Sequence, residues 1–135
     1  MASVSVKSGG SIKARKGNGF EFNTAYSMML SGYEVKRPDT NIAGVDLIAS
    51  IAGVGKLFIE CKFHKKFSWN ELEKYYKKTE VIAKERGVNF MIIFKSNQQP
   101  VLIMMDQEGC KVVIKYDDYF GVEWQKRPKG YRIFL

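Results

Sequence analysis

The 135-residue chain is poor in the residues that cross-link or divide a protein. Its two cysteines, Cys61 and Cys110, are too few for a disulfide framework, and its single histidine, His64, excludes a cluster of histidine ligands. We therefore expect neither a disulfide-rich fold nor a zinc site. The sequence contains no internal repeat, no linker and no glycine-rich phosphate loop, so we expect a single folded domain.

Long hydrophobic runs are missing as well. The longest, residues 90–94 and 101–105, are far shorter than the roughly 18 residues that indicate a membrane helix. The N-terminal stretch has basic residues among serine and glycine but no hydrophobic core, so it is not a secretory signal peptide. These absences predict a soluble, intracellular protein with no membrane partner, in the cytoplasm or nucleoid, or in the host cytoplasm if the source is viral.

Acidic residues are in the minority. The chain has 22 lysines and arginines against 14 aspartates and glutamates, which gives a net charge of +8 and a pI near 9.5. A protein of this charge attracts phosphate backbones over long range and releases their counterions on binding. Nucleic acid is therefore the first partner to consider.

Asp46, Glu60 and Lys62 form the most informative pattern in the chain, Asp-x13-Glu-x-Lys. The apolar runs 45–51 and 57–63 read as neighbouring strands joined by a hairpin. Because side chains alternate between the two faces of a strand, Glu60 and Lys62 share one face. The residues on the other face, which can enter a core, are Ile59, Cys61 and Phe63. The pattern predicts that three ionisable groups converge on one spot.

These groups suit one kind of chemistry. Two carboxylates on rigid strands are ligands for a hard divalent cation such as Mg²⁺, and an adjacent ammonium can hold a phosphate oxygen or an attacking water. Glu-x-Lys alone also describes an ordinary surface ion pair. Asp46 favours the metal interpretation because it interrupts an apolar sequence, and a buried carboxylate needs a partner. Metal-dependent phosphodiester hydrolysis is therefore the leading hypothesis.

The order of elements predicts an α/β domain built on a central mixed sheet. Residues 1–16 read as a flexible basic arm and residues 17–135 as one domain. Hydrophobic spacing and a capping box in residues 68–71 indicate two helices. The expected elements are a helix over 18–31, strands over 33–36, 45–51 and 57–63, a helix that ends at 87, and strands over 89–95, 101–105 and 111–116. The basic, aromatic stretch 124–135 matches no element.

Taken with its flanks, the motif resembles the archaeal Holliday junction resolvases, a branch of the PD-(D/E)xK nuclease superfamily. The resemblance covers about residues 13 to 105 and includes an Arg-Lys-Gly signature followed by Glu21. The matching segments are residues 15–17, 32–35, 37–38, 45–49, 58–62, the helix that follows and 89–95. The resemblance implies a restriction-endonuclease-like sheet flanked by helices, and a homodimer whose two active sites nick opposed strands of a four-way junction.

The same resemblance implies the site residues. Asp46 and Glu60 would form a metal site for Mg²⁺, or alternatively Mn²⁺, and Glu21 would reach it from the first helix. Lys62 would be the catalytic lysine. Positioning of the attacking water is its preferred role, because proton abstraction requires a strongly lowered lysine pKa. The family also has a hydroxyl residue in the loop between the first two strands, and Thr40 is the nearest match.

One feature departs from the family pattern. The acid before the second motif strand usually follows a proline, whereas Asp46 follows Val45. A literal Pro-Asp pair ends at Asp39, upstream of the strand. Asp after Pro is ordinary turn chemistry, and Asp39 lacks an apolar strand that would hold a ligand in place. Asp46 is therefore the preferred metal ligand.

DNA contacts are expected around this site. The basic residues placed on phosphates, without reading sequence, are Lys13, Arg15, Lys16, Arg37, Lys65 and Lys66. Trp69, Tyr75 and Tyr76 would either stack on open bases at a branch point or, as their helical spacing favours, pack in the core or at a dimer face. His64 reads as a plain polar residue.

Three functions remain open at this stage. A structure-selective junction nuclease is favoured by the N-terminal signature and by the compact chain. The bacterial Mrr-type restriction nucleases share several of the matching segments and would cut linear or modified duplexes, but they usually carry a specificity domain that has no counterpart in this sequence. A catalytically silent DNA-binding domain is disfavoured because all three motif residues are present.

Overall fold

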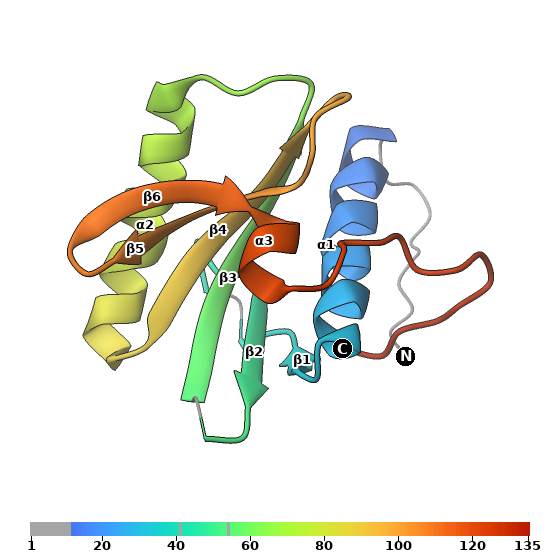
Figure 1. The fold of residues 1–135 in the computed structure, drawn as a ribbon, viewed down its shortest axis with the longest axis horizontal. Helices are drawn as coiled ribbons and strands as arrows, with labels where there is room; N and C mark the ends of the chain where they lie inside the picture. The colour runs from blue at the N-terminus through green and yellow to red at the C-terminus, as the bar shows by residue number, and fades with distance from the viewer. Residues whose placement is uncertain (1–11, 41, 54) are drawn as a thin grey trace.

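The computed structural model describes residues 12–40, 42–53 and 55–135. Its elements follow the predicted order of a helix, three strands, a helix and three strands, with one short helix added near the end (Figure 1). They are α1 (Ile12–Leu30), β1 (Glu34–Lys36), β2 (Leu47–Ile51), β3 (Gly55–His64), α2 (Trp69–Arg86), β4 (Asn89–Ser96), β5 (Leu102–Gln107), β6 (Cys110–Lys115) and α3 (Tyr116–Phe120). The α/β class is confirmed.

The strands form one six-stranded sheet in the order β1-β2-β3-β4-β5-β6. All neighbouring pairs are antiparallel except β3 and β4, which are parallel. A parallel pair needs a crossover connection, and α2 provides it. The mixed sheet predicted from the order of elements is therefore present, with the two motif strands joined as the expected antiparallel hairpin.

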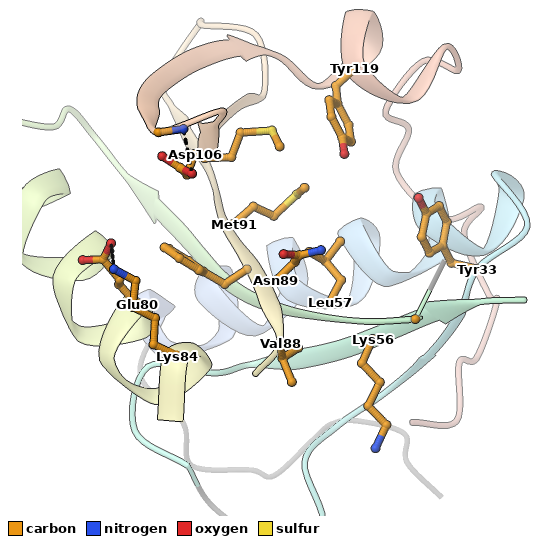
Figure 2. A pocket seen from close by; sticks show the side chains of 14 residues that line it. Tyr33, Lys56, Leu57, Glu80, Lys84, Val88, Asn89, Met91, Asp106 and Tyr119 are labelled. Atoms are coloured by element: carbon orange, nitrogen blue, oxygen red, sulfur yellow. Dashed lines mark hydrogen bonds and ion pairs between the residues drawn. The ribbon is translucent and has the colours of Figure 1, made fainter. Parts of the chain in front are cut away.

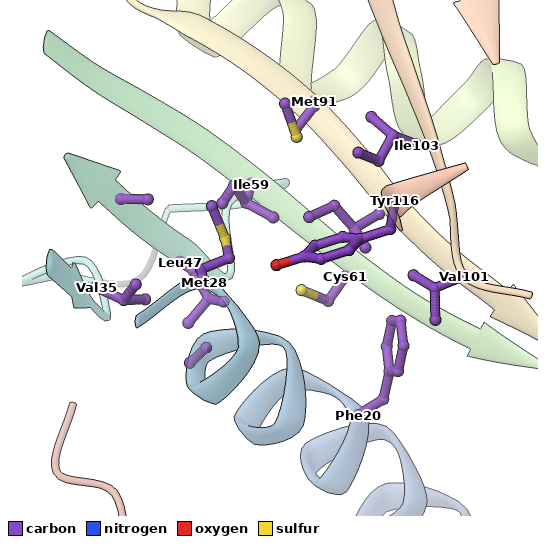
Figure 3. Packing of buried hydrophobic residues seen from close by; sticks show 13 residues of the cluster. Phe20, Met28, Val35, Leu47, Ile59, Cys61, Met91, Val101, Ile103 and Tyr116 are labelled. Atoms are coloured by element: carbon purple, nitrogen blue, oxygen red, sulfur yellow. The ribbon is translucent and has the colours of Figure 1, made fainter. Parts of the chain in front are cut away.

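The sheet has a buried layer on each face, and α1 and α2 cover opposite faces (Figure 1). On the α1 face, Phe20 and Met28 pack against Ile59 and Cys61 of β3, with Tyr116 among them (Figure 3). On the α2 face, the buried helix residues pack against β4 and β5. Because β3 is covered on both sides, both sets of its alternating side chains are held in place, and Glu60 is buried beneath α2.

Helix α1 begins at Ile12, six residues before the predicted start. The boundary proposed between a flexible arm and the domain, at residue 16, therefore falls inside the helix, while residues 1–11 lie outside the described part of the chain. The segment 12–16 consists largely of good helix formers, which explains why the helix extends through it. Gly17 and Gly19 are poor helix formers but do not end it.

Helix α2 begins and ends as its sequence predicts. The Ser68 side chain accepts a hydrogen bond from the backbone of Glu71, and the Glu71 side chain accepts one from the backbone of Ser68, so the capping box is complete. Gly87 ends the helix in the left-handed conformation at φ 64°. In the described part of the chain, every helix is too short or too polar to cross a membrane.

The C-terminal stretch, which matched no element, runs alongside α1 without regular structure. The Trp124 indole donates a hydrogen bond to the Thr24 hydroxyl at 3.0 Å. The Ser27 hydroxyl donates to the Gln125 carbonyl at 2.7 Å and accepts from the Gln125 backbone nitrogen at 2.8 Å. The Arg127 backbone donates another to Asn23, also at 3.0 Å. These bonds fix the helix that carries Glu21.

Candidate catalytic site

The structure brings Asp46 and Glu60 together through the pairing of β2 with β3. Asp46, predicted inside a strand over 45–51, lies directly before β2, which begins at Leu47, two residues later than predicted, and its backbone nitrogen donates to the Ile59 carbonyl at 2.8 Å. Its Oδ2 accepts a hydrogen bond from the Cys61 backbone at 2.7 Å. The backbone on both sides of Glu60 thus holds the Asp46 carboxylate in place.

The loop before Asp46 is fixed to α2. The Thr79 hydroxyl, which is fully buried, donates a hydrogen bond to the Gly44 carbonyl at 2.6 Å. Gly44 itself has φ +86°, a conformation that side chains rarely adopt, and Thr79 and Lys78 lie 3.3 Å from where a Cβ would stand. A glycine is therefore required here by both backbone angle and space. The loop enters β2 in one conformation.

Glu60 is an acid in an environment that disfavours its charge. Its side chain is 6% exposed. Burial and the neighbouring Asp46 raise the pKa of Glu60 well above 4.5, and the Lys62 ammonium, 3.4 Å from Glu60 Oε2, opposes this rise only in part. A cation placed against the two acids would relieve both the burial and the repulsion.

Glu21 faces the same acids from α1. Its side chain is 13% exposed, and burial together with the Asp46 charge raises its pKa to about 7. Arg37, whose Nε lies 3.0 Å from Glu21 Oε2, lowers that pKa again without cancelling the rise. The Arg37 guanidinium also lies 4.8 Å from the centre of the Phe22 ring. Arg37, predicted to contact phosphate, is thus tied to the acidic site.

The donor set suits a hard cation. Asp46, Glu60 and Glu21 offer only carboxylate oxygens, which are the ligands that Mg²⁺ and Mn²⁺ prefer. The thiol of Cys61 adds nothing, because burial and then the three acids raise its pKa well above the usual range. Within residues 12–40, 42–53 and 55–135, no three acidic, histidine or cysteine side chains are gathered closely enough to hold a metal as they stand. A third carboxylate ligand therefore requires Glu21 to exchange Arg37 for the cation.

The Lys62 ammonium has two neighbours. It lies 3.4 Å from Glu60, on the same face of β3 as predicted, and 4.5 Å from the centre of the Tyr75 ring. Tyr75 comes from α2 and is half-buried. The sequence did not reveal this contact with Lys62, because helical spacing favoured a place for Tyr75 in the core or at a dimer face. Only the tertiary contact between α2 and β3 shows that it faces the lysine.

The other predicted residues lie in exposed loops or have side chains outside the described structure. Thr40 and Asp39 are exposed in the loop between β1 and β2, and Lys65 and Lys66 are exposed in the turn after β3. The side chains of three further residues on α1, predicted to contact phosphate, fall outside the described structure: Lys13, Arg15 and Lys16. The structure therefore brings the predicted acids and Lys62 together and leaves Thr40 exposed in the loop between β1 and β2.

The aromatic residues divide into three environments. Tyr76 is buried in the core at 2% exposure, as its spacing favours. Trp69, which the same spacing also assigned to the core or a dimer face, is 68% exposed in the first turn of α2. His64, predicted to be a plain polar residue, stacks on Phe67 with ring centres 4.5 Å apart. Its ring nitrogens also contact Glu71 and Tyr75 of α2.

A separate cleft of about 550 Å³ lies away from these residues (Figure 2). Tyr33, Lys56, Asn89, Asp106 and Tyr119 line it, at the start of β3 and β4, whereas Lys62 lies near the end of β3. None of the clustered acids takes part in its walls. The cleft has its own charged lining, which includes Lys56, Glu80, Lys84 and Asp106, and is separate from the acids at the motif strands.

No family model matches the sequence, and no curated protein matches it at significance. A solved structure does match the fold: Hjc, a Holliday junction resolvase from the archaeal hyperthermophile Archaeoglobus fulgidus. The two chains are 18% identical, with a TM-score of 0.55, and the match covers 82% of this chain and 99% of the other. This likeness shows a shared fold, the mixed six-stranded sheet with flanking helices.

Proposed function

We propose that the protein is a metal-dependent endonuclease that resolves four-way DNA junctions. The proposal rests on the convergence of Asp46, which directly precedes β2, with Glu60 and Lys62 of β3, because the half-buried Asp46 lies against the buried Glu60 beside an ammonium. The fold shared with a protein described as a Holliday junction resolvase supports the same assignment. The net charge of +8 suits a phosphate backbone as substrate.

Asp46 and Glu60 would hold Mg²⁺, or Mn²⁺ in its place, with Glu21 as a third ligand. When bound, such an ion lowers the pKa of a coordinated water and neutralises charge that develops on the phosphate. The Cys61 backbone keeps Asp46 in position throughout, because its hydrogen bond does not depend on the ion. Lys62 places its ammonium beside the acids, where it can orient the attacking water or a phosphate oxygen.

Arg37 has a further part in this scheme. While it is paired with Glu21, it keeps a positive charge at the edge of the acidic site. If Glu21 turns to a cation, the guanidinium is released for a phosphate, and its 47% exposure leaves it accessible to DNA. Exposed Lys65 and Lys66 would contact the backbone nearby.

Selectivity for branched DNA is supported by Trp69. An indole that is 68% exposed, four residues after Lys65 in the chain, offers a stacking surface for an unpaired base. Bases at a branch point are more accessible than bases in a linear duplex. We propose that two copies of the chain act on one junction, since paired nicks in opposed strands need two sites. Light scattering of the free protein, which should give twice the chain mass of 15.5 kDa, tests the dimer.

One gel tests the activity. The protein is incubated with Mg²⁺ and either a labelled four-way junction or its separate linear arms, and a parallel reaction contains EDTA. Paired symmetric nicks in the junction alone, abolished by EDTA, are the expected result. Cleavage of the linear arms would instead support a restriction-like or repair nuclease, and a shifted but uncut junction would support a silent DNA-binding domain.

Matched variants assign the acid. Asp46→Asn should abolish cleavage while junction binding persists, because Asp46 lies against Glu60. Asp39→Asn should leave cleavage intact, because Asp39 is exposed in the preceding loop. The reverse pattern would show that the Pro-Asp pair upstream supplies the ligand. Lys62→Ala should also remove cleavage and keep binding.

A further inference from the structure

We propose that Tyr75 is a positioning residue that holds the Lys62 ammonium in its working place. This inference rests on the proposed function and deepens it, because it concerns the same reaction. A lysine carries its charge on a flexible four-carbon stem, so its ammonium keeps one position only when neighbouring groups hold it there. Lys62 has two such anchors: Glu60, 3.4 Å from Nζ, and the Tyr75 ring, whose centre lies 4.5 Å from Nζ.

The two anchors differ in what happens when a cation is bound. Glu60 is a proposed metal ligand, and an oxygen that turns to a divalent ion attracts the lysine less. The face of an aromatic ring attracts an ammonium through its quadrupole and is not a ligand for Mg²⁺. Tyr75 therefore keeps Lys62 beside the site during the reaction, when the ionic anchor is weakened.

The Tyr75 ring is itself held by His64. Its hydroxyl lies 3.5 Å from His64 Nε2, and the two rings pack edge to face with centres 5.9 Å apart. Phe67 in turn stacks on the His64 ring, with the two ring planes within 8° of parallel. His64 Nδ1 also lies 3.7 Å from Glu71, the acid of the α2 capping box. The start of α2 is thus linked through His64 and Tyr75 to the lysine.

A second contact of the same kind provides a control. Tyr76, the next residue of α2, packs in the core and has the Lys111 ammonium 4.4 Å from its ring centre. Lys111 also pairs with Glu73 on the surface of α2. The variant Lys111→Met therefore removes a cation–π contact from the same helix without touching Glu60 or Lys62.

The experiment compares Tyr75→Leu, Tyr75→Phe and Lys111→Met in single-turnover cleavage of a four-way junction with saturating protein and Mg²⁺. Loss of a cation–π contact corresponds to a fall of roughly 5- to 30-fold in the cleavage rate. We expect that fall in Tyr75→Leu, with junction affinity in EDTA unchanged. Tyr75→Phe, which keeps the ring, should stay within about threefold of the original protein, and Lys111→Met should cleave at the original rate.

A second measurement needs neither metal nor activity. The methylene protons next to the Lys62 ammonium should show an upfield ring-current shift in the NMR spectrum of the metal-free protein. The shift should persist in Tyr75→Phe and vanish in Tyr75→Leu. A Tyr75→Leu protein that cleaves at the original rate, or a Tyr75→Phe protein as slow as Tyr75→Leu, would overturn the inference while leaving the nuclease assignment intact. Failure of the unaltered protein to cut any DNA would remove the proposed function and this role together.

Discussion

Replacing Glu21 by glutamine is expected to stabilise the metal-free protein above pH 7. Burial and the Asp46 charge raise the pKa of Glu21 from 4.5 to about 7, although Arg37 pulls it down. The folded protein therefore holds a proton on Glu21 more tightly than the unfolded chain does. Between these two pKa values the native state binds more protons, so the free energy of unfolding falls as pH rises through this window. Glutamine carries no ionisable group and removes that dependence.

The magnitude follows from the size of the shift. At 1.36 kcal/mol per pKa unit, the rise from 4.5 to about 7 corresponds to about 3 kcal/mol, fully lost above pH 7. The Glu21 side chain is 13% exposed, so solvent screens this effect only weakly. Glu60, whose pKa is also raised, adds to the loss in the original protein and in the variant alike. The comparison between the two proteins therefore isolates Glu21.

Urea unfolding at pH 5 and pH 8, in EDTA, measures the effect. Part of this loss has already occurred at pH 5, so between the two pH values the original protein should lose about 2.5 kcal/mol more than Glu21→Gln, which is a difference of roughly 1 M in midpoint. Glu85→Gln, at an exposed position of α2, is the control and should follow the original protein. If Glu21→Gln and the original protein show parallel pH profiles, the Glu21 carboxyl is not held near the Asp46 charge as described.

Three further predictions concern the loop before the site and its DNA surface. Gly44→Ala should lower the free energy of unfolding by at least about 1 kcal/mol more than Gly53→Ala in urea titrations. The reason is that the added Cβ lies 3.3 Å from Thr79 at position 44 and meets nothing within 4 Å at position 53. Equal losses would contradict the packing. Lys65→Ala should weaken junction binding evenly across DNA sequences and reduce the slope of log affinity against log salt by about 1, and an unchanged slope would exclude a phosphate contact. Trp69→Ala should weaken junction binding by roughly 5- to 150-fold in fluorescence anisotropy and leave linear DNA unaffected, whereas junction affinity equal to that of the original protein would place the indole outside the interface.

Much of the sheet could be predicted because strand alternation is a local property. The positions of Ile59, Glu60 and Cys61 on alternate faces of β3 follow from the period of two, and the short link after β2 selects the hairpin. These rules also bring Asp46 close to Glu60. The capping box and Gly87 mark the ends of α2 through hydrogen bonds within a few residues.

The remaining features depend on contacts between distant segments. The pairing of Glu21 with Arg37 and the contact of Tyr75 with Lys62 join separate elements, so no spacing rule reveals them. Trp69 is 68% exposed, whereas helical periodicity favoured a place in the core or at a dimer face. The helix α3 was missed because its five residues follow β6 without a break, and Tyr116 was assigned to the strand.

The bonds between the C-terminal stretch and α1 join residues about 100 positions apart, such as Trp124 to Thr24 and Arg127 to Asn23. Contacts of such long sequence separation form late in folding, because a large loop must close before they are made. The sheet, α2 and the packing of α1 against β3 join nearer partners, so they can assemble while the C-terminal stretch is still loosely attached. Docking of this stretch would then be the last step that restrains the helix carrying Glu21, after the core has formed.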